Sequence, residues 1–155
     1  MTKPILNISE LEYKTMTNGD RFEARLGAIG SRLGAQKLGY NVTVVQPGKR
    51  AFPLHNHRAN EEMFFVLEGE GELRFGKERH AIKKGDVIAC PAGGVETAHQ
   101  IVNTSSAELR YLAVSTKLSP ELAEYPDSGN FAVLADGFRY IGKPASAVDY
   151  YEGNE

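Results

Sequence analysis

The chain has 155 residues, of which 41% are hydrophobic and 25% are charged, and this suits one soluble domain with its own core. The formal net charge of −2 gives no reason to expect nucleic acid or an acidic membrane surface as a partner, and no run of about 18 apolar residues is present to span a bilayer. The N-terminus lacks the apolar core of a secretory signal, and the single cysteine, Cys90, excludes an internal disulfide, so we expect a cytoplasmic protein.

The first part of the chain has the pattern of short strands separated by turns. Ser9 to Glu12 has the form of a capping box and predicts a short helical turn. Residues 18–20, with the sequence Asn-Gly-Asp, predict a turn before a strand over residues 21–29. A clearer strand is expected from Leu38 to Gln46, and one of its two rows should face inward: Leu38, Tyr40, Val42 and Val44.

The stretch from Pro47 to Gly69 contains the residues most suited to chemistry. His55 and His57 are two apart, so in a strand their side chains point to the same face. Glu62 begins the next predicted strand and can add a carboxylate, and His99 offers a third imidazole far downstream. Three nitrogens and one oxygen suit a divalent transition metal such as zinc, iron, manganese or nickel.

Strand parity does not identify the carboxylate ligand. The predicted strand from Glu62 to Glu68 is apolar on both rows, with Phe64 and Val66 on one row and Met63, Phe65 and Leu67 on the other. Parity therefore leaves both Glu61 and Glu62 open.

The pattern of short strands continues to about residue 116. Turns are predicted at residues 76–77, 84–86 and 91–94, and strands over residues 87–90, 99–103 and 108–115. Short strands with turns about every ten residues indicate an all-β sandwich or barrel.

The character of the chain changes after Lys117. Residues 119–121, Ser-Pro-Glu, have the form of a helix start, and residues 125–129 predict a turn. The region after residue 130 is rich in aromatic residues, whereas a disordered tail would contain few. We therefore expect three aromatic side chains to pack as an added layer on the sandwich or across a dimer: Phe131, Phe138 and Tyr140.

The histidine stretch resembles the first signature of the cupin superfamily, which is a glycine, His-x-His, a glutamate and a second glycine. The chain follows that order, with the usual gap before the last residue and one extra residue before the first histidine: Gly48, His55, His57, Glu62 and Gly69. The second signature is a glycine, Pro-x-Gly, a histidine and an asparagine. The chain matches its order too, with a longer loop before the histidine: Gly85, Pro91, Gly93, His99 and Asn103.

The resemblance implies an all-β fold, the single-domain cupin jelly-roll barrel or double-stranded β-helix, with a C-terminal extension. We expect one domain over residues 1–155, with a motif core at about 38–116, an N-terminal strand arm at 1–37 and a C-terminal extension at 117–155.

The resemblance also implies one divalent metal ion per subunit. Its ligands are expected to be His55, His57, Glu62 and His99, and the family spacing to Gly69 favours Glu62 over Glu61. A site of three histidines beside an unligated Glu62 is the alternative.

Other residues are weaker candidates for a function. Four side chains could contact a substrate, although each also suits packing or the surface: Tyr40, Gln46, Arg50 and Tyr111. His80 is expected to be exposed, and Cys90 is expected to be a buried structural thiol.

Similarity to small bacterial cupins suggests a metal-dependent enzyme acting on a small oxygenated molecule, either sugar-phosphate isomerase-like or a dioxygenase. A non-catalytic binding or sensing module is the alternative, because one fold hosts many activities. A homodimer is expected, since open sheet edges and the outer row of Met63, Phe65 and Leu67 need covering.

Overall fold

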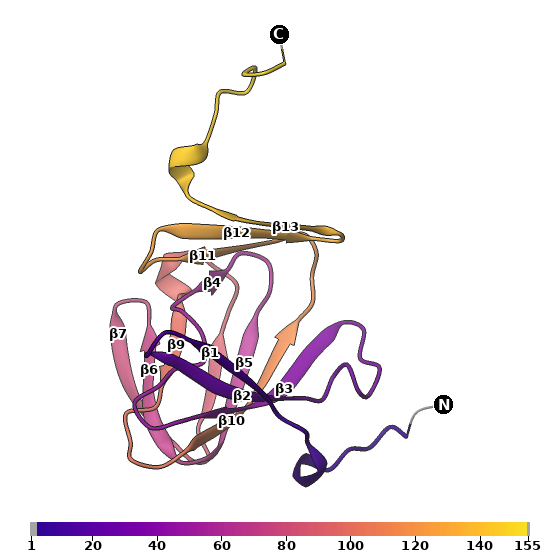
Figure 1. Ribbon diagram of the computed structural model, residues 1–155, viewed down its shortest axis with the longest axis vertical. Helices are drawn as coiled ribbons and strands as arrows, with labels where there is room; N and C mark the ends of the chain where they lie inside the picture. The colour runs from indigo at the N-terminus through magenta and orange to yellow at the C-terminus, as the bar shows by residue number, and fades with distance from the viewer. Residues whose placement is uncertain (1–2, 155) are drawn as a thin grey trace.

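The structure is a computed structural model that describes residues 3–154, and it consists mainly of antiparallel strands (Figure 1). The all-β prediction is therefore confirmed. In chain order the elements are η1 (Ile8–Glu10), β1 (Lys14–Asn18), β2 (Phe22–Ala28), β3 (Leu38–Val45), β4 (Asn56–His57), β5 (Glu62–Glu68), β6 (Glu70–Phe75), β7 (Glu78–Lys83), β8 (Val87–Cys90), η2 (Val95–Thr97), β9 (His99–Val102), β10 (Leu109–Thr116), β11 (Glu121–Tyr125), β12 (Asn130–Ala135), β13 (Phe138–Gly142) and η3 (Pro144–Ser146).

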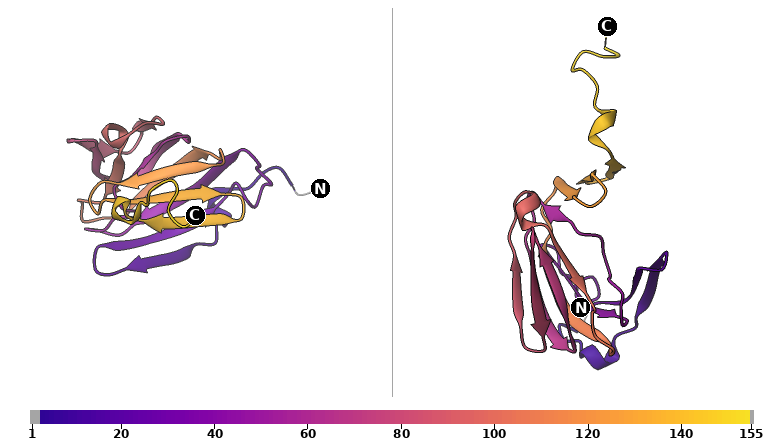
Figure 2. Two further views of the ribbon diagram at one scale, coloured as in Figure 1. Left: turned by 90° about the horizontal axis from the view of Figure 1, so that it is seen from above. Right: turned by 90° about the vertical axis from the view of Figure 1, so that its left-hand side faces the viewer.

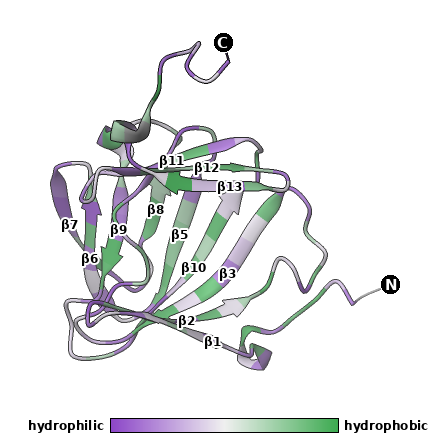
Figure 3. Cartoon of the chain, turned by 45° about the horizontal axis from the view of Figure 1, so that its top comes forward, coloured by the Kyte–Doolittle hydropathy of each residue, from purple (hydrophilic) through white to green (hydrophobic). Residues whose placement is uncertain are grey.

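Two sheets face each other and enclose the main core (Figure 2). The larger sheet has the order β1-β2-β3-β10-β5-β8, and the smaller has the order β7-β6-β9. Hydrophobic residues run through the central strands β3, β5 and β10 of the larger sheet (Figure 3). The core combines side chains from both sheets, including Val45, Val66, Leu109 and Tyr111 from the larger and Leu73 and Ile101 from the smaller.

A second apolar cluster lies on the outer face of the larger sheet. Val42 and Val44 of β3 pack there with Leu11 and Ile29, and Leu67 and Leu112 lie against them. The N-terminal segment therefore covers part of the outer row of β5 that was expected to need a partner.

The expected inward row of β3 was wrong. Thr43 and Val45 are fully buried and Asn41 borders the barrel cavity, whereas Val42 and Val44 belong to the outer cluster and Leu38 is 46% exposed. Both rows of this strand are buried from Val42 to Val45, so alternation alone does not identify the interior side.

Local structure at the N-terminus differs from the sequence prediction in two details. The helical turn is η1, and its cap is Asn7, whose side chain accepts a hydrogen bond from the Ser9 backbone. Strand β1 was not predicted, because its residues are mostly exposed and only its pairing with β2 defines it.

The C-terminal region begins with a strand and not with the helix expected at residues 119–121. In β11, Glu121 and Ala123 are buried while their neighbours are half-buried, which is the period of a strand. Strand β11 joins β4 to β12 and β13 in a four-stranded sheet that lies across one end of the barrel (Figure 1).

An ion pair fastens this C-terminal sheet to the smaller barrel sheet. Arg74 of β6 donates two hydrogen bonds to the Asp127 carboxylate in the β11–β12 turn, at 2.8 and 3.0 Å. The aromatic residues of the sheet are less enclosed than expected. Phe131 and Tyr140 are in ring contact, but Phe138 is 56% exposed and Tyr140 is 40% exposed. The chain after β13 runs away from the barrel (Figures 1 and 2).

Two truncations should separate the C-terminal sheet from the projecting tail. A chain ending at Lys117 loses β11 and with it the acceptor for three backbone N–H groups at residues 58–60, so its melting temperature should fall by about 10 °C or more. A chain ending at Lys143 keeps the sheet and should melt like the full chain. Equal melting temperatures for the two truncated chains, measured by circular dichroism, would contradict this account.

Candidate metal centre

The four predicted ligands are brought together from three separate segments of the barrel. His57 ends the short strand β4, Glu62 begins β5 and His99 begins β9. His55 precedes β4 and exchanges two backbone hydrogen bonds with His99, at 3.2 and 2.8 Å. Because of this bridge, the distant His99 lies directly opposite the His-x-His pair.

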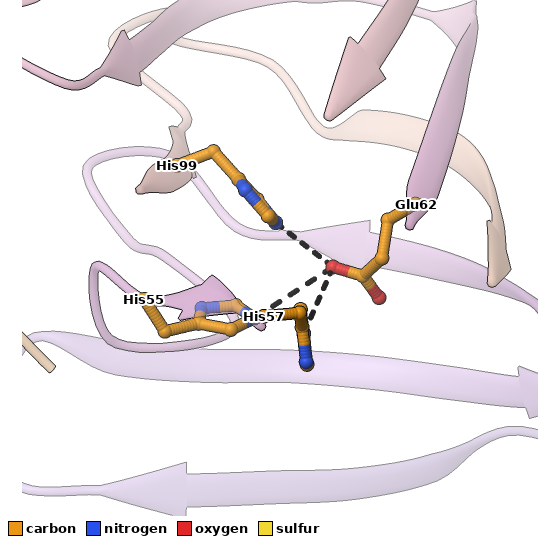
Figure 4. Close-up of side chains that lie close together, drawn as sticks. All are labelled: His55, His57, Glu62 and His99. Atoms are coloured by element: carbon orange, nitrogen blue, oxygen red, sulfur yellow. Dashed lines mark hydrogen bonds and ion pairs between the residues drawn. The ribbon is translucent and has the colours of Figure 1, made fainter. Parts of the chain in front are cut away.

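The side chains of these residues converge on one carboxylate oxygen (Figure 4). Glu62 Oε2 lies 2.8 Å from His99 Nε2, 3.5 Å from His57 Nε2 and 3.7 Å from His55 Nε2. One ligand atom from each of the four residues can be chosen so that all lie within 4.8 Å of one another. Donors about 2.1 Å from a shared ion lie about 3.0 to 4.2 Å apart, so a small contraction would complete the coordination of one metal ion.

Hydrogen bonds orient two of the imidazoles for ligation through Nε2. His55 Nδ1 lies 2.8 Å from the Pro53 carbonyl, and His99 Nδ1 lies 3.1 Å from the Thr97 carbonyl. Since a carbonyl only accepts, each Nδ1 carries a proton, so each ring in its neutral form presents the Nε2 lone pair to a cation. His57 Nε2 is buried and has no hydrogen-bond partner. The donor set therefore fits a divalent cation.

The cluster also perturbs the titration of its members. Burial alone would raise the pKa of Glu62, but the three surrounding imidazoles hold it far below its ordinary value. Burial alone would lower the pKa of His57, but the carboxylates of Glu62 and Glu121 raise it overall. Glu62 is therefore ionised at neutral pH, as a metal ligand must be.

A cavity of about 200 Å³ lies against the cluster inside the barrel. Its wall combines apolar and polar side chains, and apart from the four clustered residues it consists of Asn41, Phe52, Phe64, Gln100, Ile101, Tyr111 and Ala113. The Gln100 amide is held in place because it donates to the Phe52 carbonyl and accepts from Arg74. Burial raises the pKa of Tyr111, which keeps its hydroxyl protonated.

A second, more open hollow of about 330 Å³ reaches His57 and Glu62 from the side of the C-terminal sheet. Its wall includes the end of β10 with Lys117, and residues 134–136 at the end of β12. The two hollows share His57 and Glu62, so the cluster is accessible from two directions.

Of the four substrate-contact candidates, one lines the inner cavity and three do not. Tyr111 borders the inner cavity, while Tyr40 packs in the outer cluster and Gln46 donates to Glu108 at 2.7 Å. Arg50 is half-buried and pairs by backbone bridges with Phe22 and Val102.

Of the two candidate glutamates, Glu62 and not Glu61 lies in the cluster with the three histidines. Glu62 shares the inward row of β5 with the buried Phe64 and Val66, whereas Glu61 is exposed. His80 has a half-exposed side chain, and Cys90 is 2% exposed, both as expected. Burial, with a smaller effect of the Glu62 charge, raises the pKa of the Cys90 thiol to about 12.

Sequence reasoning missed several cavity residues. Asn41 was overlooked because it lies on the row of β3 expected to face outward, although a polar residue within an apolar strand could have indicated it. Gln100 and Phe52 gave no signal beyond being near the histidines in sequence.

Comparison with known proteins agrees with this architecture. The sequence profile of the cupin domain matches residues 41–115. The structure superposes on a candidate sugar phosphate isomerase from Acidithiobacillus ferrooxidans with a TM-score of 0.86 and 22% identity, over 97% of this chain and 98% of that one. It also superposes on a cupin-superfamily sugar phosphate isomerase from Silicibacter pomeroyi with a TM-score of 0.82 and 23% identity, over 95% and 98% of the chains.

A curated relative is similar over a shorter segment. The oxalate-binding protein of Thermotoga maritima is 36% identical over 61 residues, which are 39% of this chain and 48% of that protein. The chain spans about half the length, or less, of the curated relatives that it matches. Within residues 3–154, no helix has both the length and the hydropathy required of a transmembrane span.

Proposed function

Because this chain belongs to the cupin superfamily, we propose that it is a metal-dependent enzyme acting on a small oxygenated molecule. The observation that carries the proposal is the convergence of three imidazole nitrogens and one carboxylate oxygen at the wall of a cavity. The proposed ligands are His55, His57, Glu62 and His99, and the ion is zinc, iron, manganese or nickel. Such an ion supplies Lewis acidity toward a carbonyl oxygen.

The size and lining of the inner cavity support a small substrate. Its volume of about 200 Å³ lies below the roughly 300–1,000 Å³ of pockets for drug-sized ligands. Outside the four clustered residues, the polar residues that line this cavity are Asn41, Gln100 and Tyr111, and the rest of its wall is apolar. These groups would orient the oxygen atoms of a compound with few carbon atoms.

We propose isomerisation of a small sugar phosphate as the first reaction to test. Two proteins of this architecture carry the name sugar phosphate isomerase. Lys and Arg side chains do not line the inner cavity, whereas Lys117 lines the open hollow on the other side of His57 and Glu62. A sugar phosphate would then place its carbonyl end in the inner cavity and its phosphate near Lys117.

Proton transfer would depend on a group of this chain near the substrate. Apart from the three histidines, Glu62 and Tyr111 are the titratable residues on the inner wall, and Tyr111 stays protonated. Glu62 is therefore either a ligand or, beside a three-histidine site, the base. These two roles predict different metal binding by a Glu62→Gln variant.

Non-catalytic binding of a small dicarboxylate is the second candidate. The observation that favours it is the 36% identity over 61 residues to a protein named as oxalate-binding. A cavity without an unligated base also suits binding, if Glu62 coordinates the ion.

We also propose that the chain forms a homodimer. An apolar hollow of about 240 Å³ lies outside the barrel next to Leu38, Met63, Ala89 and Val114, where the N-terminal segment does not cover the sheet. A second copy covering this part of the sheet would remove it from water. Sedimentation at micromolar concentration should give twice the chain mass, and a monomer there would contradict the proposal.

Metal binding can be tested directly on protein purified without an affinity tag. Elemental analysis should find about one divalent ion per chain, and the double variant His55→Ala/His57→Ala should retain less than about a tenth of it because half of the ligands are gone. His80→Ala is the matched control, since this exposed histidine lies outside the cluster, and should bind like the natural chain. Full occupancy in the double variant would contradict the site.

The reaction can be tested with aldose and ketose phosphates, while oxygen uptake with iron-loaded protein tests dioxygenation. In either role of Glu62, the variant Glu62→Gln should isomerise the substrate at least about 100-fold more slowly than the natural chain. The variant should still bind the metal only if Glu62 is the base. Loss of both metal and turnover identifies a ligand. The enzyme proposal would be overturned in favour of the binding function if metal-loaded protein is inactive in both the isomerisation and the oxygen-uptake assays but binds oxalate.

A further inference from the structure

A strand outside the matched cupin segment is in direct contact with the metal ligands. The cupin profile ends at residue 115, whereas β11 spans Glu121–Tyr125. Strand β11 pairs with β4 in register, with Ala123 opposite His57 and Glu124 opposite Asn56. The C-terminal extension therefore forms part of the frame of the site.

Glu121 of β11 is the most enclosed carboxylate in this contact, at 5% exposure. One of its oxygens accepts the backbone N–H groups of Arg58 and Ala59, both at 3.0 Å. The other accepts the Asn60 N–H at 2.8 Å and also the Asn60 side-chain amide. This carboxylate fixes the bend of the chain between His57 and Glu62.

The same carboxylate faces the third histidine. Glu121 Oε2 lies 3.5 Å from His57 Nδ1, on the side of the ring opposite the Nε2 atom that faces Glu62. His55 and His99 each have a backbone carbonyl at Nδ1, whereas His57 Nδ1 is buried without a hydrogen-bond partner, and the Glu121 carboxylate faces it at 3.5 Å. A contraction of about 0.5 Å would give Glu121 the position at His57 that the Pro53 and Thr97 carbonyls occupy at the other two rings.

We propose that Glu121 is the positioning residue of the metal centre, holding the Nδ1 proton of His57 so that Nε2 is free to bind the ion. A carboxylate behind a ligating histidine fixes its tautomer and ring orientation and strengthens it as a donor. The inference rests on the proposed metal site, and it assigns to the C-terminal extension a part in binding the ion.

Glu124 supplies a matched control on the same strand. Its carboxylate accepts hydrogen bonds from Asn56 at 2.8 Å and from Arg58 at 2.7 and 3.0 Å, so it also links β11 to the β4 region. Within residues 3–154, Glu124 makes no hydrogen bond or ion pair with a histidine ring, unlike Glu121. Loss of its charge should loosen the frame without changing the His57 tautomer.

The test compares Glu121→Gln and Glu124→Gln in the full chain. Glutamine at residue 121 can donate an amide hydrogen to His57 Nδ1, which favours the tautomer with the proton on Nε2, where it blocks ligation. Zinc affinity, measured by competition with a chromogenic chelator, should fall about 10- to 100-fold in Glu121→Gln. It should change by less than about 3-fold in Glu124→Gln, since that residue lies outside the centre.

Nitrogen-15 NMR of the imidazoles supplies a readout that a purely structural role would not move. At a pH above the raised pKa of His57, where the ring is neutral, metal-free natural protein should carry the His57 proton on Nδ1. Glu121→Gln should shift this proton toward Nε2, while Glu124→Gln should not. A folded Glu121→Gln chain with unchanged zinc affinity and unchanged His57 tautomer would overturn the proposal.

The natural chain alone keeps the proposal testable if Glu121→Gln does not fold. A His57 proton found on Nε2 in the metal-free protein, or zinc bound through Nδ1, would overturn it without any variant. Failure of the proposed metal site can be distinguished from failure of the Glu121 proposal. If the metal site is wrong, the natural chain itself binds no zinc, while the His57 tautomer can still be measured.

Discussion

The structure around the site depends on one constraint: three imidazole nitrogens and one carboxylate oxygen are held close together, where their electron pairs repel one another. His55 and His99 donate their Nδ1 protons to carbonyls, so in the neutral rings the Nε2 atoms face Glu62 with lone pairs. His99 Nε2 is only 2.8 Å from a carboxylate oxygen, a distance at which two acceptors repel unless a proton or a cation lies between them. The barrel thus holds a negative and electron-rich point that a divalent ion would neutralise.

The rest of the fold holds these donors against that repulsion. The backbone bridge between His55 and His99 fixes two of them, and Glu62 presents the carboxylate from a point of β5 that is paired with β10 on one side and β8 on the other. His57 is held from the other side, through β11 and the bend at residues 58–60. Because the donors come from separate strands of a packed barrel, their geometry comes from the apolar core and not from the metal.

Sequence reasoning was successful where residue spacing reports local geometry. Strands β5 and β8 were predicted with their observed bounds, and the four clustered residues were identified through the resemblance of their order and spacing to the cupin signatures. It was less successful where tertiary contacts decide. The two rows of β3 are both buried, so the sequence pattern did not reveal that Asn41 faces the cavity.

Glu121 shows the same limit more sharply. Its sequence neighbours Ser119 and Pro120 suggest the first turn of a helix, and an acidic residue is favourable there. In the structure the same carboxylate is buried against three backbone N–H groups that lie about sixty residues earlier in the chain. No local signal contains that pairing, because it depends on β11 reaching β4 across the end of the barrel.

The position of the C-terminal sheet also bears on how cupins of one core can differ in substrate. The inner cavity is built by core strands and by the segment that carries the histidines, whereas the open hollow on the other side of His57 and Glu62 is bordered by residues 134–136 of the extension. A change in that hairpin can alter the approach to the cluster without disturbing the core that holds the ligands. The extension therefore combines two roles, since β11 supports His57 from behind while the end of β12 limits what can reach it.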